Sequence, residues 1–183
     1  TWQDIGDIVK SALAGMLHPD PPLPEIAEEI RRAAGGDDPL ALARELHRVV
    51  GQRLRPGGPP LALGTPASVS ASAGEGNRLT VALALARLLR LPARLILARP
   101  IELKGQDLGC PSPEEFPYAL LELTAGGRVV YLDYTEANFP FDSIPARIAG
   151  SDALAVPLEP ERPAEIVTLE SRETGILHDI EAD

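Results

Sequence analysis

The chain has 183 residues, of which 44% are hydrophobic and 24% are charged, and this balance predicts one globular domain with a sizeable core. The net charge of −10 argues against a nucleic-acid or anionic-membrane partner, because both require basic patches. The single cysteine, Cys110, excludes an internal disulfide framework. No pattern of metal ligands, no apolar run long enough to span a bilayer and no signal peptide is visible, so we expect neither a cofactor nor direct membrane insertion.

Three amphipathic helices are predicted in the first 51 residues. The first begins with a capping-box pattern, Thr1 followed by Asp4, and ends before Pro19. The second covers residues 25–34, with acidic residues early and basic residues late, as the helix dipole favours. The third begins at an Asp-Pro pair and closes at Gly51.

A fourth helix is predicted to be the buried centre of the domain. Residues 55–66 are rich in Pro and Gly and predict an irregular surface loop. Residues 74–77 then lead into a stretch over 78–91 in which Val, Leu and Ala cover almost every side. A helix that is apolar nearly all round is typical of a domain interior.

The second half of the chain predicts strands. A hairpin is expected around Ala125-Gly126-Gly127, because two apolar runs flank this turn signal. The predicted strands cover residues 93–98, 118–124, 128–133, 153–158 and 166–169. Helices come first and strands follow, which indicates an α+β fold rather than a parallel βαβ sheet. We expect one domain over residues 1–158, with 159–183 as an acidic tail or the start of a following β-rich segment.

Several short patterns occur in a characteristic order. Gly74-Glu75-Gly76 precedes the apolar helix, Leu91-Pro92-Ala93-Arg94 leads into a strand, and the hairpin ends in Leu132-Asp133-Tyr134-Thr135. This order resembles the transglutaminase-like domains of the papain-like cysteine enzymes. The opening Thr-Trp-Gln-Asp-Ile, a Pro-Glu-Ile helix start and the segments from Ile144 and Ala153 resemble a bacterial multidomain subgroup of that family. The resemblance covers residues 1–158. It implies a papain-like α+β fold, in which N-terminal helices and a buried central helix pack on a small antiparallel sheet.

The resemblance also implies positions for a Cys-His-Asp triad. The cysteine, histidine and aspartate positions of such domains correspond to Gly76, Tyr118 and Asp133. A turn at Ala125-Gly126 would put Tyr118 opposite Asp133, and a turn at Gly126-Gly127 would put Leu120 there instead. In both registers Tyr118 and Asp133 are cross-strand neighbours. Only Asp133 matches the triad, since glycine has no nucleophile and a phenol with a pKa near ~10 is not a base at neutral pH.

The resemblance therefore predicts a pseudoenzyme with a binding or structural role. Glu75, Asn77 and Tyr134 are expected to line a vestigial cleft that holds a peptide or protein segment, unless flanking domains of the same chain are the partner. The Tyr118 hydroxyl is expected to donate a hydrogen bond to Asp133. Because the chain begins without a methionine, we expect it to be part of a longer protein, and the subgroup implies an exported or periplasmic one. The oligomeric state stays open.

Two other interpretations stay open. An active hydrolase or transferase could use a different nucleophile, namely Cys110 or a serine such as Ser70 or Ser72 before the apolar helix. Alternatively the chain is an unrelated α+β domain, in which Gly76 only begins a helix. The three histidines are far apart in the sequence, so they do not predict a metal site, and His47 is expected on a helix surface.

Overall fold

The computed structural model describes residues 1–57, 64–106, 112, 115–135 and 140–170. Its helices are α1 (Trp2–Met16), α2 (Leu23–Ala34), α3 (Pro39–Arg53), α4 (Ala67–Ala73) and α5 (Arg78–Leu88), with a short 3-10 helix η1 (Ile101–Leu103). Its strands are β1 (Arg55–Pro56), β2 (Glu75–Gly76), β3 (Ala93–Ala98), β4 (Tyr118–Ala125), β5 (Arg128–Leu132), β6 (Asp152–Pro157) and β7 (Glu165–Thr168).

The main sheet is antiparallel throughout and has the strand order β5-β4-β3-β6-β7. This confirms the α+β class and the five strands expected from the sequence. The strand predicted over residues 166–169 pairs with β6 as an edge of the same sheet. The sheet therefore continues beyond Leu158, where the sequence had suggested a boundary, and the buried side chain of Leu169 belongs to the domain.

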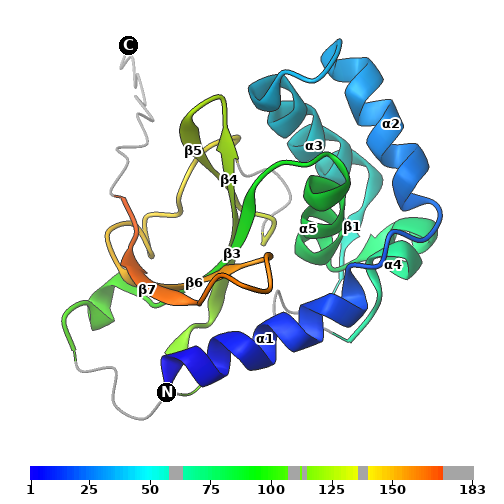
Figure 1. Cartoon of the computed structure of the whole chain (residues 1–183). Helices are drawn as coiled ribbons and strands as arrows, with labels where there is room; N and C mark the ends of the chain where they lie inside the picture. Colours follow the sequence, from blue (N-terminus) through cyan, green and yellow to red (C-terminus); the bar gives the residue numbers. More distant parts are fainter. Residues whose placement is uncertain (58–63, 107–111, 113–114, 136–139, 171–183) are drawn as a thin grey trace, which may run out of the picture.

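Helices cover one face of the sheet (Figure 1). Figure 1 shows α2, α3, α4 and α5 gathered beside the sheet, while α1 runs along its lower edge. The main core lies between helices and sheet, and α5 is at its centre because residues 78–86 are all buried. A smaller core lies on the opposite face, where residues 144–149 cover the strands. No helix in the described part of the chain combines the length and apolarity needed to cross a membrane.

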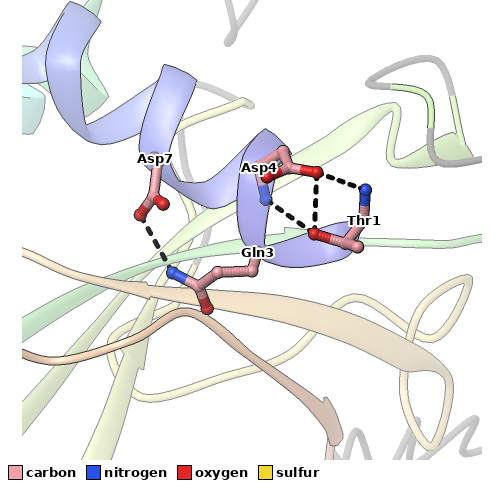
Figure 2. Close-up of polar contacts among 4 residues, drawn as sticks. All are labelled: Thr1, Gln3, Asp4 and Asp7. Carbon is pink, nitrogen blue, oxygen red and sulfur yellow. Dashed lines mark hydrogen bonds and ion pairs between the residues drawn. The ribbon is translucent and has the colours of Figure 1, made fainter.

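The start of α1 forms as its sequence predicts. The Thr1 hydroxyl accepts a hydrogen bond from the Asp4 backbone N–H (3.3 Å), and the Asp4 carboxylate accepts from Thr1, which completes a capping box (Figure 2). Gln3 adds a hydrogen bond to Asp7 one turn later (2.9 Å). The capping box gives the Asp4 N–H a partner that the first turn of a helix does not itself provide, whereas the bond from Gln3 to Asp7 joins two side chains.

Helix α4 was not expected. Its sequence, Ala67 to Ala73, alternates Ala and Ser around one Val and has no apolar stripe of helical period. Its buried side is formed by the small residues Ala67, Ser68 and Ser70, which let it lie close to its neighbours. Ser70 of this short helix lies close to Gly76 in the segment that follows it.

Two glycines of α1 are expected to respond oppositely to alanine. Gly15 is exposed, and a Cβ there would meet nothing within 4 Å, so Gly15→Ala should raise the unfolding free energy by about 0.5–1 kcal/mol. At Gly6 a Cβ would collide with the Cβ of Ala164, so Gly6→Ala should lower it by about 1–3 kcal/mol. Urea unfolding of both variants checks this, and a loss of stability in Gly15→Ala would contradict it.

Candidate functional site

The N-terminus of α5 is built by a short parallel ladder. Strand β1 follows α3 and pairs with β2, and the Gly57 N–H donates to the Gly76 carbonyl (3.0 Å). Asn77 is the N-cap of α5, and its side-chain oxygen accepts from the Thr80 N–H (3.1 Å). The loop expected at residues 55–66 thus begins with a strand that fixes the entrance to the central helix.

Gly76 is required by this geometry. Its φ is +135°, a value that side-chain-bearing residues rarely adopt, and an added Cβ would lie 2.5 Å from the Ser70 Oγ. Position 76 therefore has no room for a cysteine on this backbone. It also lies two residues before α5, whereas a nucleophile that benefits from the helix dipole would sit in the first turn. A cysteine at position 76 would therefore need a shift of the backbone and of Ser70, and the assignment of Gly76 to the cysteine position of the family stays a prediction.

The hairpin has one of the two predicted registers. Ala125 pairs with Arg128 across the turn at Gly126-Gly127, and Leu121 pairs with Leu132. Extending this register by two residues places Ala119 opposite Tyr134. Leu120 then lies opposite Asp133, as expected for a turn at this position.

The side chains predicted to face Gly76 lie on the other side of the sheet. Tyr118 packs against the smaller core, and the Arg147 guanidinium lies 4.9 Å from its ring centroid. One Asp133 oxygen accepts from the backbone and hydroxyl of Thr135 (2.7 and 2.6 Å). The other has no partner among the described residues, so the expected hydrogen bond from Tyr118 is not formed.

The neighbouring residues, one position along each strand, face α5 instead. Ala119 and Tyr134 belong to the main core, together with the residues of α5. Because side chains alternate along a strand, a shift of one residue moves a position to the opposite face. The residues that meet at the helix entrance are therefore Ala119, Tyr134 and the first helical residue, Arg78. The motif order in the sequence had suggested neither Ala119 nor Arg78. The apolar residues at every second position over 119–125 could have identified Ala119 as facing the core.

Two adjoining cavities lie at this place. The smaller, of about 100 Å³, is lined by Asn77, Arg78, Ala119, Tyr134 and Thr135 together with Pro56, Gly57, Gly76 and Leu79. The larger, of about 530 Å³, is lined by Ser70 and Glu75 and shares Gly57, Gly76 and Asn77 with the smaller one. Of the residues expected in a cleft, Asn77 lines both cavities, Tyr134 lines the smaller and Glu75 the larger.

Arg78 and Tyr134 give the smaller cavity its electrostatic character. Arg78 is only 6% exposed, and its guanidinium donates to the Leu54 and Gly51 carbonyls at the end of α3 (2.7 and 3.1 Å). Burial lowers the pKa of Arg78, although the Arg side chain stays charged at any ordinary pH. Burial raises the pKa of Tyr134 far above its ordinary value, so its hydroxyl is a neutral hydrogen-bond donor.

The alternative nucleophiles are not activated in the described structure. The Ser72 hydroxyl donates to the Ser68 carbonyl of its own helix (2.8 Å). Ser70 Oγ is buried and has no partner among the described residues, and no histidine lines either cavity. His47 is half-buried, with its ring 5.6 Å from that of Tyr134, and so is less exposed than expected. Cys110 lies outside the described residues, and within them no group of side chains could hold a metal ion.

Comparisons with known proteins support the fold. No protein-family model matches the chain, and no curated protein matches it significantly. Among solved structures, the crystal structure of a "putative protease" from Parabacteroides distasonis ATCC 8503 superposes with a TM-score of 0.62 at 11% sequence identity. The match covers 91% of this chain and 31% of that protein. The chain thus shares its α+β fold with about one third of a larger protein.

Proposed function

We propose that this chain is a non-catalytic domain of transglutaminase-like ancestry, with a binding role at the entrance to α5. The observation that carries the proposal is the set of side chains at that entrance. The cavity there is lined by Arg78, Ala119 and Tyr134, none of which carries a thiol or an imidazole. A charged guanidinium, a methyl group and a neutral phenol cannot begin acyl transfer.

Two further observations support a binding role. Neither cavity has a cysteine or a histidine among the described residues that line it, and the larger one is wide enough for a side chain of a peptide or protein segment. The order of motifs along the sequence resembles the transglutaminase-like family, in which this part of the fold is the substrate cleft. A structural role toward neighbouring domains of a larger bacterial protein is the related alternative, since the solved match spans only 31% of its own chain.

Covalent labelling tests the absence of catalysis. At pH 7 we expect iodoacetamide to modify Cys110 no faster than it modifies free glutathione, because nothing in the sequence around it lowers a thiol pKa. A fluorophosphonate should leave all serines unmodified, as read by intact-mass spectrometry and peptide mapping. The same protein unfolded in urea is the control for accessibility. Rapid stoichiometric labelling of Cys110, Ser70 or Ser72 in the folded protein only would contradict the proposal and indicate an active hydrolase or transferase.

A further inference from the structure

Arg78 is a buried cation without a carboxylate partner in the described part of the chain. Its two hydrogen bonds go to the carbonyls of Leu54 and Gly51, which carry no net charge and use two of its five N–H donors. Three donors are left on a side chain that is 6% exposed and lines a cavity. Because a buried charge without a counter-ion destabilises a fold, this arrangement favours an anion beside Arg78.

Tyr134 lines the same cavity, and its buried hydroxyl is a second donor. Tyr134 is 6% exposed, and its hydroxyl has no hydrogen-bond partner among the described residues. Tyrosine hydroxyls in protein interiors usually find a partner, because leaving one unpaired is unfavourable. A ligand with acceptor oxygens in the cavity would supply that partner.

The α5 N-terminus adds a favourable potential. Asn77 satisfies the Thr80 N–H, but the helix itself provides no acceptor for the N–H groups of Arg78 and Leu79. Both residues line the smaller cavity. The positive end of the helix dipole and the guanidinium therefore act on the same space.

We propose that the smaller cavity binds one carboxylate, presented by the C-terminal residue of a peptide whose last side chain occupies the larger cavity. This specifies the ligand of the proposed binding function and rests on it. A planar monoanion suits a single guanidinium and a volume of about 100 Å³ better than a dianionic phosphate does. Glu75 lines the larger cavity and would repel a second negative charge, so the last side chain is not acidic.

Titration of the intact 183-residue chain with model peptides tests this, with backbone amide NMR shifts as the readout. The probe is acetyl-Ala-Ala-Ala with a free carboxylate, and its C-terminal amide is the matched neutral control. We expect saturable shifts at residues 77–79, with the amide binding about tenfold or more weakly. Equal binding of the two peptides would overturn the proposal. Tighter binding of inorganic phosphate would overturn the carboxylate assignment, and equal affinity for N-acetylglycine would overturn the peptide as the source.

Tyr134→Phe is the decisive variant because it removes only a hydroxyl that has no described partner, and so leaves folding intact. It should weaken peptide binding about 3- to 10-fold. Arg78→Lys, which keeps the charge but loses the fork of donors, should weaken it further. Arg87→Gln, an exposed residue at the other end of α5, is the control and should have no effect. Unchanged affinity of Tyr134→Phe for the peptide would contradict the proposed site.

The two proposals fail in different ways. If the carboxylate site is wrong, the peptide causes no amide NMR shifts, or shifts that do not distinguish acid from amide. If the non-catalytic proposal is wrong, the labelling reagents cause a covalent mass change.

Discussion

Replacing Gly76 by cysteine is expected to destabilise the domain rather than to create an enzyme. The substitution forces a side chain onto a backbone with φ of +135° and brings its Cβ to 2.5 Å from Ser70 Oγ. Backbone strain and overpacking each cost about 1–3 kcal/mol, so the unfolding free energy should fall by about 2–6 kcal/mol. For a domain of this size that corresponds to a drop in Tm of about 4–24 °C. Calorimetry or thermal circular dichroism measures it.

The matched control is the same substitution at Gly64. A Cβ there would meet nothing within 4 Å, and its φ lies outside the left-handed range, so Gly64→Cys should leave Tm almost unchanged. The double variant Gly76→Cys with Ser70→Gly should recover the part of the loss that comes from the collision. A Gly76→Cys protein as stable as the parent, with a thiol that alkylates rapidly at pH 7, would restore position 76 as the place of a lost nucleophile.

Removing the carboxylate of Glu122 is expected to have a comparable effect. Glu122 is 4% exposed on β4 and pairs across the sheet with Arg94 of β3. The two side chains form a bidentate ion pair, with N–O distances of 2.6 and 3.0 Å. Loss of one partner of a buried pair costs about 3–5 kcal/mol. Because Arg94 is 26% exposed and keeps a second partner, we expect Glu122→Ala to cost about 2–4 kcal/mol in urea unfolding.

Glu165 provides the comparison, since it binds the same guanidinium from the edge strand β7 at 2.6 Å. Its side chain is 59% exposed, so the ion pair is screened by solvent and Glu165→Ala should cost less than about 1 kcal/mol. Equal losses for the two variants would show that burial does not distinguish the two ion pairs.

The sequence predicted most of the secondary structure because the signals are local. The capping box at Thr1, the apolar helix from Arg78 and the turn at Gly126-Gly127 each specify their element within a few residues. Helix α4 was missed because Ala and Ser carry no periodic pattern, so tertiary packing decides its conformation.

The candidate site was harder to predict because successive side chains of a strand point to opposite faces of the sheet. Motif order suggested Tyr118 and Asp133, but the residues that face α5 are Ala119 and Tyr134. The need for glycine at position 76 could not be seen in the sequence either, because it depends on the φ of that residue and on where α4 places Ser70. The buried cation at Arg78 also required the fold, because its burial depends on how α3, α5 and the hairpin pack.

The position of α1 has a consequence for how the chain folds during synthesis. Within the domain α1 is synthesised before the other elements, yet it packs on β6 and β7 near the other end of the domain, with Gly6 against Ala164. The side of α1 at Gly6 therefore stays uncovered until Ala164 has been synthesised, more than 150 residues later. Because such distant contacts form late, the nascent domain should fold in one step near the end of its translation, and should depend on chaperones until then.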